Sequence, residues 1–169
     1  METSSYGHLG LEKVFKIAHE KRVLVVTLGN ELRGDDSLGV KLAEALCKQG
    51  LGDKLLNAGI MLENLISVII RRRPEVVIFV DAIDANLNPG EIVVYDFDED
   101  FKEITPLTTH KLPLKVIAKF IRKELSSVKI FLIGVQVKSY EFGDEMSEEV
   151  KGALNKLKVF FRKLLTSTP

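Results

Sequence analysis

The sequence predicts an α/β fold, a three-layer α/β/α sandwich around a mostly parallel, twisted sheet of about five strands. Short runs of apolar and β-branched residues alternate with segments whose apolar residues recur at helical spacing, which is the order of β-α-β units. The run at 75–80 is apolar on both faces, as is typical of a parallel strand covered by helices on both sides. A chain of 169 residues is also long enough to form one core of this kind.

In the first half of the chain, hydrophobic periodicity predicts alternating strands and helices behind an N-terminal extension. Residues 1–21 are expected to form a short polar tail and an extra helix, and residues 22–169 a single α/β domain. Gly50 ends one helical segment and Pro74 follows another, because both residues favour positions just beyond a helix. The expected elements are a strand at 24–28, a helix at 38–49, a weaker strand at 54–58, a helical stripe at 62–70 and a strand at 75–80.

The second half continues the alternation after the turn signal Asn88-Pro89-Gly90. Between residues 113 and 125 the apolar side chains fall on one helical face. Ser147 is expected to cap the closing helix, since a serine hydroxyl can accept a hydrogen bond from a backbone N–H of the first turn. The expected elements are a strand at 92–95, a helix at 113–125, a strand at 130–133 and a helix at 148–165.

Composition excludes several classes of function. The chain has 24 basic and 24 acidic residues, and this balance argues against a general nucleic-acid binder or a protein of the membrane surface. Its one cysteine, Cys47, excludes an internal disulfide and a thiolate metal cluster, and is expected to be a buried or half-buried small hydrophobe. Without a membrane-length apolar run or a signal-peptide core, the protein is expected to be cytoplasmic. A monomer is expected because the helices cover both faces of the sheet.

Three residues able to bind a metal lie near the predicted ends of strands or starts of helices. Asp36 follows the first strand, Asp81 is the first polar residue after the strand at 75–80, and His110 precedes the helix at 113. In α/β folds, ligands bind at the carboxyl ends of the strands. Asp36 alone could equally cap a helix, and the position of His110 depends on how residues 97–110 fold. Together, two carboxylates and an imidazole suit Zn, Ni or Mn.

Other catalytic signatures are missing from the sequence. The segment G-N-E-L-R-G at 29–34 lacks the G-x-G-x-x-G spacing of dinucleotide-binding loops, and the chain has no P-loop. It has no G-x-S-x-G nucleophile elbow and no cysteine near a histidine. A nucleophilic triad is therefore poorly supported.

Four blocks of sequence, in order, resemble the hydrogenase maturation endopeptidases. The resemblance covers residues 22–165, and its second and third blocks are most similar to the members that serve formate-hydrogenlyase-type hydrogenases. After the second strand, Glu63-Asn64 match the family, whereas Ala58 and Leu62 replace a glycine and a proline of its usual motif. The blocks are GN followed by GDD and Gly39 at 29–39, VDA with NPGEI at 80–92, TTHKLPL at 108–114 and IGVQ at 133–136.

The resemblance implies an endopeptidase that removes the C-terminal extension from the large-subunit precursor of a nickel–iron hydrogenase. It assigns metal contact to Asp36, Asp81 and His110, the same residues that the topology selects. It also implies that no metal is resident: the nickel is carried by the substrate, and another divalent ion could take its place. The residues that this resemblance links to substrate binding are Gly29, Asn30, Asp35, Glu63 and Asn64, with Asp35 as an alternative cap or support for the site.

The reaction itself leaves alternatives open. As a peptidase of the aspartic or metal-dependent type, the protein would use Asp36 or Asp81 to activate water, or the nickel of the substrate to polarise the bond. A different class of function is a non-catalytic maturation chaperone that binds the precursor. A third is a metal-dependent hydrolase with a resident ion. The sequence does not identify the precursor or the bond that is cut.

Overall fold

The computed structural model describes residues 5–98 and 114–169 of the chain. Strands and helices alternate through most of this part, as hydrophobic periodicity predicts. The strands are β1 (Ser5–Tyr6), β2 (Val23–Leu28), β3 (Leu55–Gly59), β4 (Val76–Ile83), β5 (Ile92–Asp96) and β6 (Lys129–Gln136). The α-helices are α1 (Gly7–Ala18), α2 (Leu38–Lys48), α3 (Ile66–Arg72), α4 (Leu114–Glu124) and α5 (Glu148–Thr166), and short 3-10 turns occur at η1 (Gly34–Ser37), η2 (Gly52–Lys54) and η3 (Leu62–Leu65).

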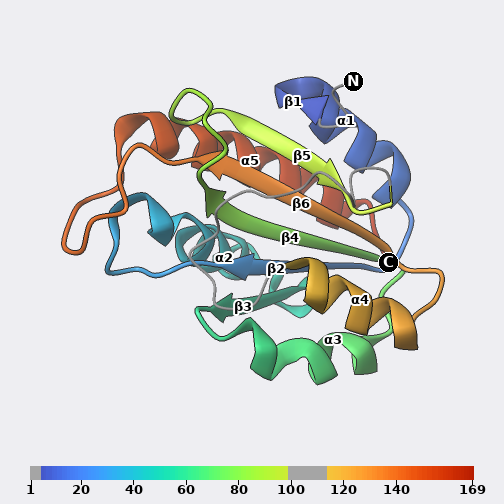
Figure 1. Cartoon of the computed structure of the whole chain (residues 1–169). Coiled ribbons are helices and arrows are strands. Elements are labelled where there is room, and N and C mark those ends of the chain that lie inside the picture. Colours follow the sequence, from blue (N-terminus) through green and yellow to red (C-terminus); the bar gives the residue numbers. More distant parts are fainter. Residues whose placement is uncertain (1–4, 99–113) are drawn as a thin grey trace.

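The strands form one mixed sheet in the order β1-β5-β6-β4-β2-β3 (Figure 1). The four strands β3, β2, β4 and β6 are mutually parallel, whereas β5 runs antiparallel to β6 and β1 antiparallel to β5. The predicted mostly parallel α/β sheet is therefore confirmed. A sixth strand, β1, extends the expected five; its two residues are too few to produce a periodic pattern.

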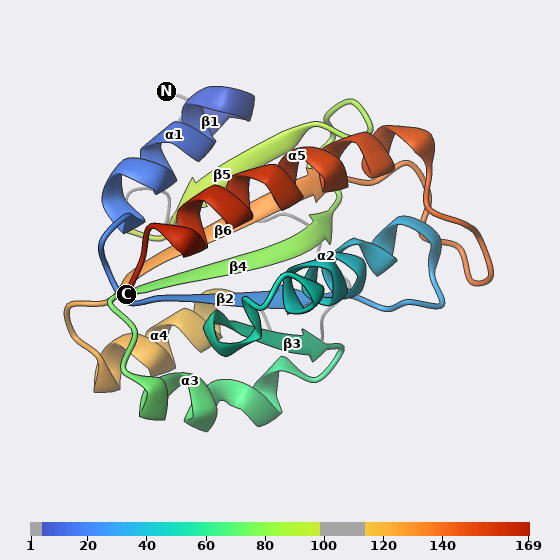
Figure 2. The ribbon, with the colours of Figure 1, turned by 180° about the vertical axis from the view of Figure 1, so that it is seen from behind.

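Helices cover both faces of the sheet, which confirms the three-layer sandwich. The side chains of Ile78 and Val80 join a core with α2 and α5, and those of Val77 and Phe79 join a second core with α3 and α4. This alternation follows from the pleat of a strand, whose successive side chains point to opposite faces. Figure 2 shows α2 and α5 in front of the sheet. The N-terminal helix α1 contacts β5 and α5 on the same side.

Several elements differ in detail from the sequence prediction. Strand β4 continues past Val80 to Ile83, because Asp81 and the two residues after it keep their pairing with β6. The helix predicted at 62–70 begins as the 3-10 turn η3 before it becomes α3. Cys47, expected to be at least half-buried, is exposed on α2. Among the described helices, none is both long and apolar enough to cross a membrane.

The parallel strands place their carboxyl ends at one edge of the sheet, called the carboxyl edge below. The arrowheads of β2, β3, β4 and β6 lie together at this edge in Figure 1. Loops that leave it carry residues 29–33, 60–61, 84–91 and 137–147. Both aspartates predicted to bind a metal lie on elements at this edge.

Candidate active site at the carboxyl edge

Two glycines allow the chain to fold tightly after β2. Gly29 has a φ of +147°, and a Cβ atom there would lie 2.1 Å from the backbone oxygen of Asp36. A Cβ atom at Gly39, in the first turn of α2, would lie 1.9 Å from the backbone oxygen of Leu28. The loop is closed by a hydrogen bond of 3.0 Å from Asn30 N to Asp36 O. As a result, α2 begins directly on the end of β2, and Asp36 is held beside that strand end.

Asp36 is almost completely buried, with 1% of its surface exposed. It lies in η1, and the N-cap position of α2 is Ser37, whose hydroxyl donates to Gly34 O at 2.7 Å. Asp36 therefore does not occupy the N-cap position of α2, the alternative role considered from the sequence. The element that carries it, η1, contacts β4.

Asp81 lies within β4 and is fully buried, opposite Gly134 of β6. Strand alternation puts its side chain on the same face as Val77 and Phe79, the face covered by α3 and α4. Asp36 and Asp81 are thus two buried carboxylates on elements that touch. Carboxylate oxygens are ligands that divalent cations accept, so the two side chains are chemically able to contact a metal.

His110, the third predicted metal contact, lies outside the described residues, which end at Asp98 and resume at Leu114. Its approach to the two aspartates remains a prediction. Within the part of the chain that the structure describes, no three histidine, cysteine or acidic side chains form a group able to hold a metal.

Asp35 fixes a long loop rather than facing outward. It is fully buried, and its carboxylate accepts four hydrogen bonds from residues 138–147. Oδ2 accepts from the backbone N–H groups of Lys138 at 2.7 Å and Ser139 at 3.1 Å and from the hydroxyl of Ser147 at 3.0 Å. Oδ1 accepts from the Ser147 backbone N–H at 2.7 Å. These contacts correspond to the supporting role that the sequence left open for Asp35.

The other predicted substrate-binding residues lie on loops and turns at the carboxyl edge. The side-chain oxygen of Asn30 accepts a hydrogen bond from Leu32 N at 3.0 Å and so shapes the loop after β2. Glu63 and Asn64 are exposed on η3, which follows β3. Gly29 N donates to Gly59 O at 3.0 Å and thereby joins the loop after β2 to the end of β3.

Sequence reasoning assigned no role to Gln136, which is 5% exposed at the end of β6. Its Oε1 accepts from the backbone of Ala85 at 2.8 Å and Leu87 at 3.1 Å, and its Nε2 donates to Asp84 Oδ1 at 3.2 Å and Val137 O at 3.0 Å. All of its hydrogen-bonding capacity is used to order the loop that follows the strand of Asp81. In the sequence, the only indication of this role is that Gln136 is an amide at the end of an otherwise apolar strand.

Lys138 lies at the carboxyl edge, but its ion-pair partner is Glu149 and not Asp36 or Asp81. Its ammonium contacts Glu149 Oε1 of α5 at 2.8 Å. The hydrogen bond to Glu149 raises the pKa of Lys138, and the same bond lowers the pKa of Glu149. Both groups are therefore charged at neutral pH and balance one another.

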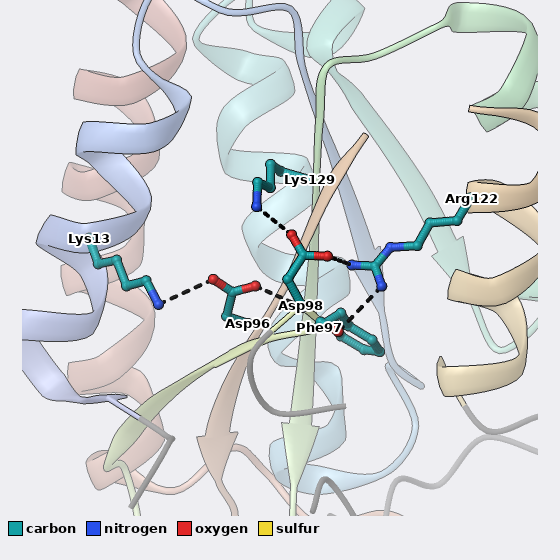
Figure 3. Close-up of polar contacts among 6 residues, drawn as sticks. All are labelled: Lys13, Asp96, Phe97, Asp98, Arg122 and Lys129. Carbon is teal, nitrogen blue, oxygen red and sulfur yellow. Dashed lines mark hydrogen bonds and ion pairs between the residues drawn. The ribbon is translucent and has the colours of Figure 1, made fainter. Parts of the chain in front are cut away.

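A second group of charges lies where β5 ends, near the start of β6 and thus at the opposite edge of the sheet (Figure 3). Asp98 pairs with Arg122 of α4 and with Lys129 of β6. Asp96 contacts Lys13 of α1 at 3.1 Å and accepts a hydrogen bond from Asp98 N at 2.9 Å. The hydrogen bond with Asp98 raises the pKa of Lys129. This network joins β5, α4 and β6 far from the candidate site.

A groove of about 1150 Å³ lies between α1 and α5, and includes none of the predicted site residues. Its walls combine apolar side chains such as Leu11, Phe15 and Phe160 with charged ones. The chemistry-bearing carboxylates are instead at the carboxyl edge, where α/β folds usually bind their ligands. We therefore place the candidate site at that edge.

A family model and a similar protein of known function both point to hydrogenase maturation proteases. A family model described as hydrogenase maturation protease matches residues 40–159. The hydrogenase 3 maturation protease of Escherichia coli (strain K12) is 35% identical over 132 residues, which cover 78% of this chain and 83% of that protein.

Solved structures of similar proteins agree in fold. The crystal structure of a NiFe hydrogenase maturation protease HycI from Thermococcus kodakarensis KOD1 superposes with a TM-score of 0.78 at 31% identity, covering 91% of this chain and 99% of the other. The solution structure of an endopeptidase HycI from Escherichia coli gives a TM-score of 0.71 at 30% identity, over 85% of this chain and 88% of the other.

Proposed function

The chain belongs to the hydrogenase maturation protease family, and from this membership we propose that it is an endopeptidase that removes the C-terminal extension of a nickel–iron hydrogenase large-subunit precursor. The observation that carries this proposal is the pair of buried carboxylates, Asp36 and Asp81, on touching elements at the carboxyl edge. The cytoplasm as its location, a monomeric enzyme, and the lack of nucleic-acid or membrane partners remain predictions from the sequence.

We propose that Asp36, Asp81 and His110 recognise the nickel already installed in the precursor. Carboxylate oxygen and imidazole nitrogen suit nickel and similar divalent ions. In this account the metal is part of the substrate, so the enzyme needs no resident cofactor. Cleavage then follows only when the precursor is loaded, and the enzyme acts as a checkpoint on metal insertion.

The cleavage step adds water across one peptide bond. Water attacks the carbonyl carbon, the C–N bond breaks, and the departing amine takes a proton. Asp36 or Asp81 would accept the proton of the attacking water as a general base, or the substrate nickel would polarise the carbonyl. Both routes require the two carboxylates beside the bond that is cut, and both predict loss of cleavage when either is neutralised.

Substrate contacts are proposed for the loops around this pair. Gly29 and Asn30 follow β2, and Glu63 and Asn64 follow β3, so the precursor would cross the ends of neighbouring strands. Asp35 would act on the substrate indirectly, by holding the 138–147 loop in place.

Amide substitution tests the proposal with little change in side-chain volume. Asp36→Asn and Asp81→Asn should each abolish processing of a nickel-loaded precursor, measured by the mass of the product, and His110→Ala should do the same. Glu44→Gln, which removes an exposed carboxylate from α2, is the matched control and should process normally. Far-UV circular dichroism and thermal unfolding would show that each variant is folded. Processing at the wild-type rate by Asp36→Asn or Asp81→Asn contradicts the proposed roles.

The same assay separates the two other functions considered from the sequence. A maturation chaperone would form a stable complex with the loaded precursor and release no shortened product. A hydrolase with a resident ion would be purified with stoichiometric metal and would lose activity on chelation even when its substrate carries nickel. Either result replaces the proposal above.

A further inference from the structure

Exposed apolar side chains gather around the candidate site. Among the residues that the structure describes, eight large apolar side chains are exposed, and half of them lie on loops at the carboxyl edge. These four are Leu32, Ile60, Met61 and Phe142. Phe142 is the most exposed of them at 73%, and Leu32 is 55% exposed. Large apolar residues grouped in this way commonly mark an interaction surface.

Phe142 and Leu32 lie on adjacent loops. Gly143 N donates a hydrogen bond of 2.9 Å to Leu32 O, which joins the loop after β6 to the loop after β2. Both views of the ribbon show these two loops side by side, projecting beyond the end of the sheet (Figures 1 and 2). Leu32 is four residues before Asp36. A protein that covers Leu32 and Phe142 is therefore in position to extend toward the two carboxylates.

The loop that presents Phe142 is held firmly. The carboxylate of Asp35 binds both ends of the loop, at Lys138–Ser139 and at Ser147. Two backbone hydrogen bonds reinforce these contacts: Gly34 N to Asp144 O at 3.1 Å and Asp35 N to Ser139 O at 3.0 Å. A surface that is already ordered loses less conformational entropy when a partner binds.

The charge around Phe142 is predominantly acidic. Four exposed carboxylates lie on the two loops, against two basic side chains: Arg33, which is half-buried, and Lys138, which is paired with Glu149. The four are Glu31, Glu141, Asp144 and Glu145. A partner complementary to this surface would combine an apolar side chain with basic neighbours, since opposite charges steer association and fix orientation.

We propose that Leu32, Phe142 and the surrounding carboxylates form a docking surface for the hydrogenase large-subunit precursor. The segment that binds there would present an apolar side chain flanked by lysine or arginine, close to the bond that is cut. This inference rests on the proposed function, because it takes the precursor as the protein that must reach Asp36 and Asp81. Continuity of the surface with the candidate site, through the loop that joins Leu32 to Asp36, is the reason for choosing the precursor as its occupant.

Alanine substitution tests the docking surface separately from cleavage. Leu32→Ala and Phe142→Ala, alone and together, should raise the Kd for the nickel-loaded precursor and the KM of processing by about tenfold or more in the double variant, while kcat at saturation is retained. Phe120→Ala is the matched control, since Phe120 is 57% exposed on α4, and should change neither value.

A salt titration tests the charge of the partner. For the wild-type protein, the Kd for the precursor should rise with ionic strength, because exposed charges are screened. Glu141→Gln with Glu145→Gln should weaken binding at low salt and flatten this dependence. A salt dependence unchanged by these substitutions would overturn the basic character assigned to the partner.

The outcomes distinguish the docking surface from the proposed function. If the wild-type protein cleaves the precursor and the Leu32→Ala/Phe142→Ala variant has the same Kd and KM, the docking surface is wrong and the proposed function stands. If the wild-type protein binds but never cleaves, while the double variant binds more weakly, the proposed function fails and the docking surface stands. If the substitutions instead convert a dimer of the isolated protein to a monomer in analytical ultracentrifugation, the surface joins copies of this chain and the docking proposal is overturned.

Discussion

The carboxylate of Asp35 accepts two hydrogen bonds from Ser147, one from its backbone N–H at 2.7 Å and one from its hydroxyl at 3.0 Å. Ser147 is also the N-cap of α5, where its hydroxyl oxygen accepts a hydrogen bond from Val150 N at 3.4 Å. One buried carboxylate thus connects η1, which carries Asp36, with the start of the closing helix. The geometry of the site and the order of the 138–147 loop depend on the same group.

Substitution of Asp35 is therefore expected to destabilise the whole domain. Asp35→Ala leaves the backbone N–H groups of Lys138, Ser139 and Ser147 without their acceptor, and each such part-buried group costs about 1–3 kcal/mol. We expect a loss of about 3 kcal/mol or more in the free energy of unfolding, measured by urea denaturation. Processing should fall as well, because the loop is no longer fixed.

Ser147→Ala is the matched variant for this prediction. It removes the hydroxyl but keeps the backbone N–H that donates to Asp35, so the cost should be about 1–2 kcal/mol, as for the loss of a helix cap. Equal destabilisation by Asp35→Ala and Ser147→Ala would show that the carboxylate does not hold the loop through several bonds.

Two glycines should respond to alanine in opposite directions. At Gly39 a Cβ atom would lie 1.9 Å from Leu28 O, so Gly39→Ala must move α2 away from β2 and should cost about 3 kcal/mol or more. Gly152 is in α5, where a new Cβ atom meets nothing within 4 Å. Gly152→Ala should stabilise the protein by about 0.5–1 kcal/mol and raise the Tm by about 1–4 °C. Tolerance of Gly39→Ala without loss of Tm would contradict the close contact described here.

The ion pairs at the end of β5 should contribute a stability that depends on pH. The hydrogen bond to Asp98 raises the pKa of Lys129 above its ordinary value of 10.5, so the folded state binds this proton more tightly than the unfolded state. The contribution is then fully present below about pH 10 and is lost as the pH rises through the folded-state value. Because both side chains are partly exposed, its size should be about 1 kcal/mol or less.

Lys129→Met tests whether the stability contributed by this ion pair is lost, rather than gained, as the pH rises. The stability difference between the wild-type protein and Lys129→Met, from urea denaturation, should be constant between pH 7 and 9 and shrink above about pH 10.5. High salt should reduce it at neutral pH. A difference that grows with increasing pH would contradict the assignment.

The sequence predicted most of the fold because each main element has its own hydrophobic period. Strand β4 is apolar on both faces, and α4 has a clear apolar stripe, so neither depends on distant contacts to be recognised. Strand β1 was missed because two residues carry no period. The end of β4 was missed because Asp81 continues the ladder as a polar residue, which sequence patterns interpret as a strand end. The apolar run predicted at 130–133 stops at Gly134, although the ladder of β6 continues to Gln136.

The candidate site was predictable only in part. Asp36 and Asp81 were found because each follows an apolar strand, a position that depends on local sequence and topology alone. A supporting role was left open for Asp35, but its hydrogen-bond partners were not predicted, since they are more than 100 residues away along the chain. The same holds for Gln136, which binds a loop about 50 residues earlier. Contacts of this kind depend on tertiary structure and leave no periodic signal.

The central claim is that the enzyme recognises the nickel bound to its substrate and cleaves only a precursor that carries it. The most direct test is to incubate the protein with nickel-loaded and nickel-free large-subunit precursor, and to measure the mass of the product over time. The account predicts a shortened product from the loaded precursor alone, and no product from either precursor with Asp36→Asn or Asp81→Asn. Cleavage of the nickel-free precursor at the same rate as the loaded one would contradict it.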